Sequence, residues 1–306
     1  MSSKVLVVGR TGQLACELRR LAWPARLTAA FFERPEIDLA QPEEACRFVV
    51  DARPAIVVNA AAYTAVDAAE TDSEMAFTVN RDAPAALADA CCQIGAPLIH
   101  ISTDYVFDGS KTGAYREDDP ISPLSVYGAS KAEGEAAIRE RHDRHVIIRT
   151  AWLYSPFGLN FVKTMLSLGA ERDRLRIVND QQGSPTAAAD LAAAVITVCA
   201  ALSDGREDGF GTFHFRGGGT TTWYDFACEI FRNAWRRGLK VPDFIEPIHT
   251  KDYPTPAQRP RNSVLHCGKI ARTYGIVAPP WEDSLAPCID EIVAATPQSI
   301  APGALR

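Results

Sequence analysis

The sequence predicts an α/β fold: a Rossmann-type, doubly wound parallel sheet with a smaller C-terminal α/β lobe. Apolar strand-like runs alternate with helical segments as far as residue 217, and a glycine turn follows the first run directly. After Gly219 the pattern changes, first to a helical segment and then to a Pro-rich one. Alternating strands and helices are typical of βαβ units in a parallel sheet, and the change of pattern indicates a separate lobe.

The first strand is expected over residues 4–8, KVLVV, and it ends at a glycine. The segment GRTGQLA follows and leads into a helical pattern from Cys16 to Leu21. Gly9 allows the tight turn, and Gly12 lets the backbone approach a pyrophosphate at the helix N-terminus. Ala15 stands where a third glycine is common and is small enough for close helix–strand packing. The alternative is an ordinary βα turn, but strand, glycine turn and helix together favour a dinucleotide site.

A second strand is expected over Leu27–Phe32, and the residue after such a strand normally meets the adenosine ribose. Glu33 would suit a free 2′-hydroxyl, whereas Arg34 would suit a 2′-phosphate, so NADH and NADPH both stay open. Asp38 and Leu39 are expected beside the adenine ring, although Asp38 could equally cap the next helix.

The third strand ends in small residues. The elements up to the fourth strand are expected as a helix over 43–52, a strand over 55–62, a helical segment over 66–80 and a helix over 81–94. Small side chains at the C-terminal end of a parallel strand leave room for a ligand. We therefore expect Ala61, Ala62 and Tyr63 to lie along a dinucleotide cofactor.

The fourth strand, over 97–102, leads directly into Thr103 and Asp104, and a helix over 127–138 presents Tyr127 and Lys131. Four residues are about one helical turn, so the phenol and the ammonium share a face. A free phenol has a pKa of about 10, and a neighbouring cation favours the phenolate. A threonine hydroxyl, a tyrosine and a lysine suit proton transfer to a carbonyl oxygen while a hydride reaches its carbon. The alternative is a chance Tyr-x-x-x-Lys with a solvated lysine, and His100 is interpreted as a core histidine.

The remaining elements continue the alternation and then depart from it. They are expected as a strand over 145–154, a helix over 160–170, a strand over 175–180, a helix over 187–202, a strand over 211–217, a helix over 224–237 and a Pro-rich segment over 253–263. We assign residues 1–150 and roughly 173–217 to an NAD(P)-binding domain. Residues 151–172 and 218–306 are assigned to a substrate lobe.

Composition excludes several classes of protein. The net charge of −6 and the lack of a basic run argue against a nucleic-acid surface. No apolar run reaches about 18 residues, so no membrane span is expected. The 8 cysteines lack a Cys-x-x-Cys spacing and no signal peptide precedes the first strand, which predicts reduced thiols and a cytoplasmic protein. The 6 histidines lack metal-ligand spacing, so zinc is not expected.

Segments along almost the whole chain resemble one family. They are GRTGQLA, VVNAAAYTAVDAAE, ISTDYVFDG, SPLSVYGASKAEGE, IRTAWLYS, NFVKTML, VNDQQGSPT, GGTTTWYDFA and YPTPAQRPRNS. The chain resembles extended short-chain dehydrogenase/reductases and, more narrowly, dTDP-4-dehydrorhamnose reductases. The resemblance implies that NAD(P)H gives a hydride to C4 of dTDP-4-dehydro-L-rhamnose and that dTDP-L-rhamnose is formed.

The resemblance also implies residue roles. Tyr127 is the proton donor, Lys131 lowers the phenol pKa and binds the nicotinamide ribose, and Thr103 orients the carbonyl oxygen. The implied cofactor-binding residues are Gly9, Thr11, Gly12, Gln13, Leu14, Asp38, Leu39, Ala61, Ala62, Tyr63, Thr64, Tyr127 and Lys131. The implied substrate-binding residues are Thr103, Asp104, Phe107, Trp152, Lys163, Gln181 and Arg259. Trp152 could instead be a core tryptophan, and Arg259 a solvated loop residue.

Some members of the family carry a divalent metal at a dimer contact. The matching positions are Glu17, Asp190 and Glu291, which implies a structural Mg²⁺ and a homodimer, although Asp190 is shorter than the usual glutamate. Ala151 replaces a common serine before the tryptophan. Two alternatives stay open: a reductase or epimerase for another nucleotide sugar, which would hold oxidised cofactor tightly, and a non-catalytic regulatory partner of methionine adenosyltransferase. The intact threonine, tyrosine and lysine argue against the regulatory partner, because a non-catalytic protein does not need them.

Overall fold

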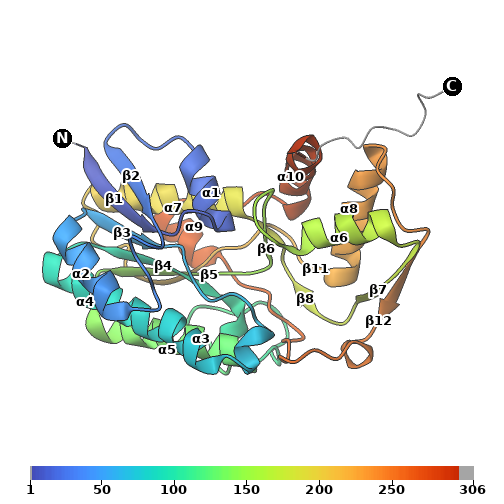
Figure 1. Cartoon of the computed structure of the whole chain (residues 1–306), viewed down its shortest axis with the longest axis horizontal. Coiled ribbons are helices and arrows are strands. Elements are labelled where there is room, and N and C mark those ends of the chain that lie inside the picture. Colours follow the sequence, from blue (N-terminus) through green and yellow to red (C-terminus); the bar gives the residue numbers. More distant parts are fainter. Residues whose placement is uncertain (1, 296–306) are drawn as a thin grey trace.

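The computed structural model describes residues 2–295, and a six-stranded parallel sheet forms the centre of its larger part (Figure 1). In spatial order the strands are β10 (Gly211–His214), β5 (His145–Thr150), β4 (Leu98–Thr103), β3 (Ile56–Asn59), β1 (Ser3–Val8) and β2 (Leu27–Phe32). The chain passes from β1 outward to β2 and then back to β3 on the other side of β1. This reversal confirms the doubly wound fold, and such a switch point is where open α/β sheets bind ligands.

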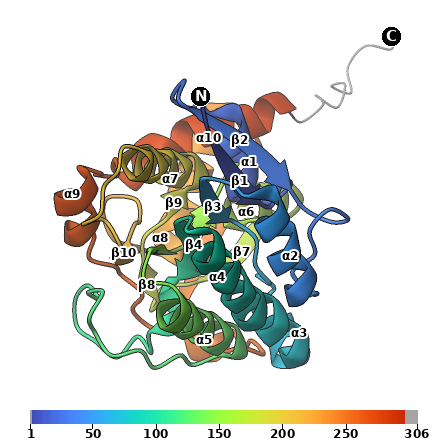
Figure 2. The ribbon, with the colours of Figure 1, turned by 90° about the vertical axis from the view of Figure 1, so that its left-hand side faces the viewer.

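Helices cover both faces of the sheet, so the residues of its inner strands β5, β4, β3 and β1 are mostly buried. One face is covered by α1 (Gln13–Arg20), α7 (Ala188–Ser203) and α9 (Gly268–Tyr274), and the other by α2 (Pro42–Ala52), α4 (Ala83–Ile94) and α5 (Val126–Arg141). Figure 2 shows these helices in two layers. Between β3 and α4 lie α3 (Ser73–Phe77) and a π-helical turn, Thr78–Asp82, and both pack on α5.

A smaller group of elements lies beside the sheet (Figure 1). It contains the helices α6 (Phe161–Glu171), α8 (Trp223–Arg236) and α10 (Trp281–Ala295), and the short strands β6 (Leu153–Tyr154), β7 (Arg174–Val178), β8 (Gln182–Gly183), β9 (Thr186–Ala187), β11 (Thr221–Thr222) and β12 (Phe244–Ile248). Its own apolar cluster includes Tyr154, Phe226 and Leu285. The lobe therefore has a core separate from the two cores that flank the sheet.

Three elements differ from the sequence-based expectation. The strand expected over 175–180 forms as β7, but it pairs with β12 and not with the main sheet. The strand expected over 145–154 breaks after Thr150, and its second part, β6, pairs with β9. Helix α9 packs against β10 and α7 of the larger part, although its residues were assigned to the substrate lobe. An apolar pattern predicts a strand but not its partner, and the exact domain limits stay a prediction.

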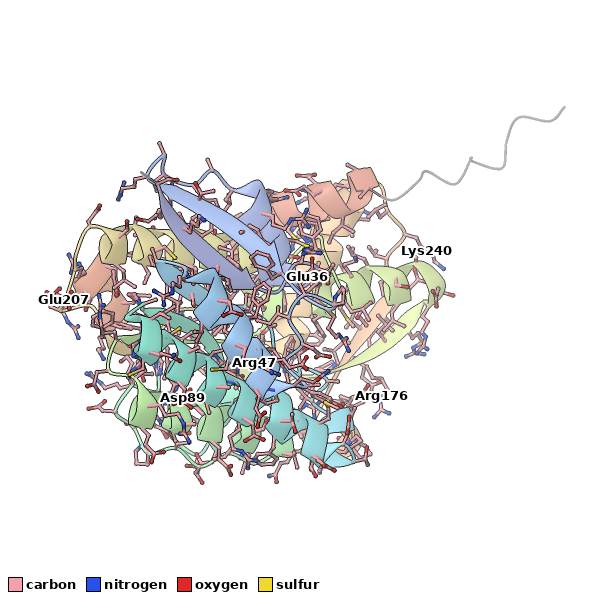
Figure 3. All side chains as sticks on the ribbon, turned by 60° about the vertical axis from the view of Figure 1, so that its left-hand side comes forward. Glu36, Arg47, Asp89, Arg176, Glu207 and Lys240 are labelled. Carbon is pink, nitrogen blue, oxygen red and sulfur yellow. The ribbon has the colours of Figure 1, made fainter. Side chains whose placement is uncertain are left out.

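Charged side chains project from the outer surface, as the six labelled residues in Figure 3 show. Arg47 is an example: its side chain is 71% exposed, and its nearest carboxylate oxygen, on Glu44, is 3.7 Å away. None of the helices within residues 2–295 combines the length and apolar character needed to span a membrane. The cytoplasmic location stays a prediction.

Candidate active site

The residues expected to act on a carbonyl meet at the C-terminal edge of the sheet. Thr103 is the last residue of β4, Tyr127 lies in the first turn of α5, and Lys131 follows one turn later. Ser125 caps this helix, since its hydroxyl accepts a hydrogen bond from the Gly128 N–H at 3.1 Å. The start of α5 is thereby fixed beside the end of β4.

Two glycines let α5 sit directly on neighbouring backbone. A Cβ on Gly128 would overlap with the carbonyl oxygen of Tyr105, and a Cβ on Gly134 with that of Asn80. Asn80 also ties the site together, because its amide donates to the Tyr63 carbonyl and to the Ser130 hydroxyl, both at 3.0 Å. Only glycine permits so close an approach, so these two positions set the depth at which the phenol sits.

The phenol of Tyr127 is partly buried and holds its proton firmly. Burial and the nearby Asp104 carboxylate raise the pKa of Tyr127 to about 12, and the Thr103 hydroxyl lowers it only in part. In this structure burial outweighs the lowering of this pKa that is expected from Lys131, and the role of the lysine stays a prediction. The lysine ammonium is turned to other partners, and desolvation of the phenolate dominates.

Lys131 is almost completely buried. Its Nζ donates to the Ile101 carbonyl at 2.7 Å and lies 3.0 Å from His100 Nε2. Burial lowers the pKa of Lys131 to about 8, although the Glu135 carboxylate opposes this shift. The lysine therefore titrates close to the physiological range, which a solvated lysine does not.

A fully buried ion pair lies behind Lys131. Glu135, one turn further along α5, accepts hydrogen bonds from Arg149 Nε at 2.9 Å and Arg149 Nη2 at 2.7 Å. The Ser102 hydroxyl donates to the same carboxylate at 2.6 Å. Arg149 and these hydrogen bonds hold the pKa of Glu135 below its usual range, against the effect of burial. The sequence interpretation missed Glu135, because a glutamate in a helix is usually a surface residue.

Asp104 stands next to Thr103, and its side chain is buried. The Thr103 hydroxyl donates to Asp104 Oδ1 at 3.0 Å. Burial raises the pKa of Asp104 to about 7, and the Ser263 hydroxyl lowers it in part. Near neutral pH the carboxyl group can therefore either donate or accept a hydrogen bond.

Trp152 lies where β5 ends and adopts an unusual backbone conformation. Its φ of 46° is in the left-handed region, which is uncommon for a bulky residue and is often found at functional sites. Its indole stacks on Trp223, with ring centroids 3.6 Å apart and planes at 11°, and covers Gly183. The sequence interpretation did not single out Trp223, although it lies in the segment GGTTTWYDFA.

The other expected substrate residues are differently placed. Phe107 has no exposed surface and stacks on Tyr115, so it is a core residue in this structure and not a substrate contact. Lys163 Nζ donates to the Pro156 carbonyl at 3.2 Å, and the Gln181 amide to the Thr250 hydroxyl at 3.1 Å. The structure does not bring these polar groups directly to Tyr127.

Arg259 is already paired. Its guanidinium donates to both carboxylate oxygens of Asp67, at 2.7 and 2.9 Å, and also to the Ala257 carbonyl. This ion pair joins the Pro-rich segment to the segment after β3, and Asp67 was not identified from sequence because the two residues lie 192 positions apart.

The β1–α1 turn leaves its backbone open at Gly12. Gly9 has a φ of 117°, and a Cβ on Gly12 would meet no atom within 4 Å. Thr11 and Gly12 are exposed and Gln13 is partly exposed, whereas Leu14 packs in the core. The open space at the N-terminus of α1 fits a pyrophosphate.

The other expected cofactor residues line the same edge of the sheet. Asp38 accepts from the Ala40 N–H at 2.9 Å, and the Leu39 side chain is buried in the core. Beyond β3 the partly exposed residues Ala61, Ala62 and Tyr63 are followed by the exposed Thr64. The residues present therefore fit a nicotinamide dinucleotide.

Glu17, Asp190 and Glu291, the positions expected to hold a metal, line one cavity of about 330 Å³. Arg20 lies between two of them: its Nε is 2.6 Å from Glu17 Oε2 and its Nη2 donates to Glu291 Oε1 at 2.9 Å. Asp190 accepts from the Ser284 hydroxyl. Within residues 2–295 no group of three or more His, Cys, Asp or Glu side chains could hold a metal ion. The structure thus gives Mg²⁺ no support, and the homodimer stays a prediction.

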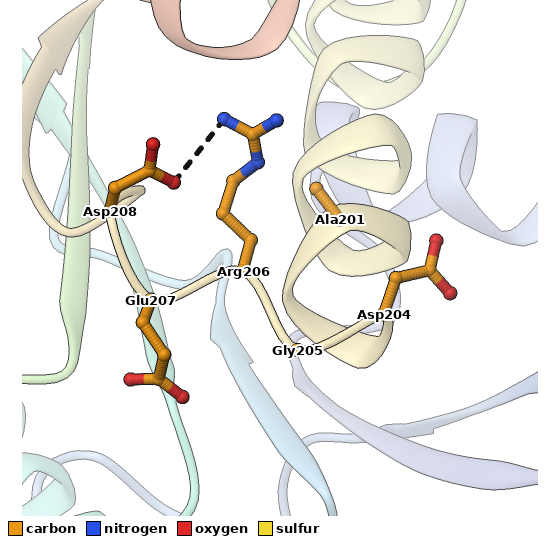
Figure 4. A pocket seen from close by; sticks show the side chains of 6 residues that line it. All are labelled: Ala201, Asp204, Gly205, Arg206, Glu207 and Asp208. Atoms are coloured by element: carbon orange, nitrogen blue, oxygen red, sulfur yellow. Dashed lines mark ion pairs between the residues drawn. The ribbon is translucent and has the colours of Figure 1, made fainter.

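A second cavity, of about 590 Å³, lies at the opposite edge of the sheet (Figure 4). It is lined by Ala201, Asp204, Gly205, Arg206, Glu207 and Asp208. Asp204 pairs with Arg26, just before β2, and Glu207 pairs with Arg144, just before β5. This hollow is therefore at the N-terminal edge of the strands, away from Thr103.

Comparisons with known proteins agree with this geometry. The family model described as "RmlD substrate binding domain" matches residues 3–294. The chain is 46% identical over 285 residues to a dTDP-4-dehydrorhamnose reductase of Sinorhizobium fredii, covering 92% of this chain and 95% of the relative. It is 40% identical over 299 residues to the reductase of that name from Escherichia coli K12, covering 95% and 99%.

Solved structures give the same result. A dTDP-4-dehydrorhamnose reductase from Clostridium acetobutylicum superposes with a TM-score of 0.86 at 37% identity, covering 94% of this chain and 98% of the other. The reductase from Bacillus anthracis, solved in complex with NADP, superposes with a TM-score of 0.86 at 34% identity, covering 95% and 100%.

Proposed function

This chain belongs to the RmlD substrate binding domain family, and on that premise we propose that it reduces the C4 ketone of dTDP-4-dehydro-L-rhamnose to dTDP-L-rhamnose. The observation that carries the proposal is the grouping of Thr103, Tyr127 and Lys131 at the switch-point edge of the sheet. The chain matches reductases of that name over nearly its whole length, which supports the substrate.

The residues divide the chemistry among them. A bound reduced nicotinamide would supply the hydride. Tyr127 gives its proton to the oxygen of the ketone as that oxygen gains negative charge, and the raised pKa of the phenol keeps the proton available at neutral pH. The Lys131 ammonium stabilises the phenolate that is left. The Thr103 hydroxyl, which donates to Asp104 in the structure, can turn to donate to the ketone oxygen.

Substrate recognition is assigned to the border between the two lobes. One face of the Trp152 indole can cover an apolar edge of the sugar, while Trp223 stacks on the opposite face of that indole. Asp104 can hydrogen-bond a sugar hydroxyl in either protonation state. Arg259 can reach a diphosphate only if it shares or releases Asp67, so its first role is to hold the Pro-rich segment in place.

The proposed cofactor is NADPH. Glu33, which would suit a free 2′-hydroxyl, is turned back to the glycine loop, where it accepts from the Thr11 N–H at 3.1 Å and from the Thr11 hydroxyl at 2.9 Å. Arg34 is exposed and has no ion pair among the described residues, so it is free to meet a 2′-phosphate. The bound NADP of the Bacillus anthracis reductase supports the same choice.

The direct test is a coupled assay with the purified protein, enzymatically generated dTDP-4-dehydrorhamnose and either cofactor. We expect sugar-dependent oxidation of NADPH with a higher kcat/KM than for NADH. Arg34→Gln should raise the KM for NADPH and leave the KM for NADH unchanged. No oxidation with either cofactor would reject the proposal, and oxidised cofactor that stays bound through purification would favour an epimerase.

The rate should fall at alkaline pH. Lys131 must be an ammonium to stabilise the phenolate, so the active form is present below its pKa of about 8 and is lost as pH rises through that value. A plot of log kcat/KM against pH should therefore bend downward near pH 8. Asp104→Asn removes the carboxyl group beside Thr103, whose pKa is raised to about 7, and should leave this alkaline limb in place. A profile that stays flat to pH 10 would show that the charge on Lys131 is not needed.

A further inference from the structure

Three buried polar side chains form a continuous chain behind the site. Asn59 on β3 and His100 on β4 are opposite each other in the parallel register, and Lys131 reaches His100 from α5. Asn59 Nδ2 lies 3.1 Å from His100 Nδ1, and Lys131 Nζ lies 3.0 Å from His100 Nε2. All three side chains are at most 1% exposed. Lys131 therefore has an imidazole, and not water, as its partner on this side.

The imidazole is neutral and carries a single N–H, because burial and the Lys131 charge hold the pKa of His100 well below its usual range. Asn59 Oδ1 accepts from the Ala61 N–H at 3.2 Å, which turns the amide nitrogen of Asn59 toward His100. His100 Nδ1 must then accept, and its proton lies on Nε2 and points at Lys131. An ammonium has no lone pair, so this tautomer fits only a neutral Lys131 amine.

The other tautomer fits the ammonium. With the proton on Nδ1, Nε2 accepts from Lys131, but Nδ1–H then faces the amide nitrogen of Asn59. The amide must turn over to accept this proton, and the Ala61 N–H then loses its acceptor. Each charge state of Lys131 thus requires its own arrangement of His100 and Asn59, and the arrangement that fits the ammonium leaves the Ala61 N–H without an acceptor.

We propose that His100 is a positioning residue that couples the charge on Lys131 to its own tautomer, and that Asn59 biases that tautomer. This inference rests on the proposed function, in which the Lys131 ammonium stabilises the Tyr127 phenolate. Ala61 follows β3 at the edge of the sheet where the cofactor is expected. The Asn59 amide therefore also links that edge, through His100, to Lys131. His100 is thus more than a satisfied core residue, which was its interpretation from sequence.

Other titratable groups lie near Lys131, both on α5 and on the elements packed against it. On the elements packed against α5 they include Glu70, which accepts from the Val126 N–H, Asp104 and Tyr105 after β4, and Arg149 on β5. Arg81 pairs with Asp82 and with Glu133 of α5, and Asp89 pairs with Arg141 of α5. Tyr127, Glu135 and Arg139 also lie on α5. Glu135 is the carboxylate that favours the ammonium. His100 and the Ile101 carbonyl are the two direct hydrogen-bond partners of Nζ.

Asn59→Asp tests the coupling directly. A carboxylate only accepts, so it would hold the proton on Nδ1, leave Nε2 free to accept from the ammonium and still serve the Ala61 N–H. The alkaline limb of log kcat/KM should move up by roughly 1 pH unit. His100→Leu removes the acceptor and should move the limb down, whereas His100→Gln, whose amide oxygen can accept, should restore it.

His142→Gln is the matched control. His142 is also a buried histidine, but it lies at the far end of α5, where its Nε2 is 2.9 Å from the Ala96 carbonyl. This variant should keep the wild-type pH profile even if it loses stability. A shift of the limb in His142→Gln as large as that in His100→Leu would reduce the effect to general destabilisation and overturn the proposal.

A second readout needs no substrate. In protein with ¹⁵N-labelled histidine, the His100 nitrogens should exchange protonated and unprotonated chemical shifts as pH passes through the Lys131 transition, and Asn59→Asp should hold the Nδ1–H form throughout. A tautomer that stays constant from pH 6 to pH 10 in the wild-type protein would overturn the proposal. If the protein shows this change but does not turn over the dTDP sugar, the proposed function fails and the coupling stands.

Discussion

Tyr127→Phe is expected to lower kcat by about 10²–10⁴-fold, the usual contribution of a positioned proton donor. The substitution keeps the ring and its edge-to-face contact with Tyr105, at 5.9 Å between centroids, and removes only the hydroxyl. The oxygen of the ketone then has no acid at the moment when the hydride arrives. Single-turnover measurement of NADPH oxidation in the presence of the sugar reports this step directly.

The control is Tyr105→Phe, which removes a partly buried phenol beside Tyr127 without removing the proton donor. This variant should stay close to the wild-type rate. Binding of NADPH to Tyr127→Phe, measured by fluorescence titration, should be nearly unchanged, because the phenol acts on the ketone. Full turnover in Tyr127→Phe would remove this residue from the proton-donor role and leave Asp104, with a pKa of about 7, as the alternative acid.

The larger part of the fold follows from the sequence because its causes are local. Strands that are covered on both faces must be continuously apolar, as KVLVV and AIVV are, and the alternation with helices leaves few ways to connect them. Gly9 marks the first turn because its φ of 117° excludes most other residues. The same logic placed Thr103 at a strand end and Tyr127 with Lys131 on one face of a helix.

What the sequence does not contain is the choice of long-range partner. The apolar pattern of β7 resembles that of the sheet strands, yet β7 pairs with β12, about 70 residues later in the chain. Arg259 was expected to be free for a diphosphate and is held by Asp67, and Phe107 was expected at the substrate and is buried. Each outcome depends on which segments the fold brings together.

Electrostatic roles were the least predictable. The spacing of Tyr127 and Lys131 is correct, but spacing does not tell where Nζ points. In the structure Nζ is bound by His100 and by the Ile101 carbonyl, while burial raises the phenol pKa and lowers the lysine pKa. Burial acts on both groups at once, and its extent is a property of the packed structure.

Arg149→Met is expected to lower the free energy of unfolding by about 3–5 kcal/mol, the range found when one partner of a buried ion pair is removed. Glu135 would keep the Ser102 hydroxyl and a hydrogen bond from Arg139 at 3.1 Å, but it would lose both bonds from Arg149. The guanidinium also lies 5.1 Å from the centre of the Phe107 ring, a contact that methionine replaces only in part. Urea unfolding followed by circular dichroism measures the loss.

The exposed Arg47 provides the matched control, since Arg47→Met makes the same change at a surface site and should leave the unfolding free energy close to that of the wild type. The double variant Glu135→Leu/Arg149→Met separates the two causes of the loss. If the penalty comes from a carboxylate left buried without its cation, removing that carboxylate should recover part of the stability, because apolar replacements of a whole buried pair are often tolerated. A double variant as unstable as the sum of the two single variants would instead mean that packing around Arg149, and not its charge, stabilises this region.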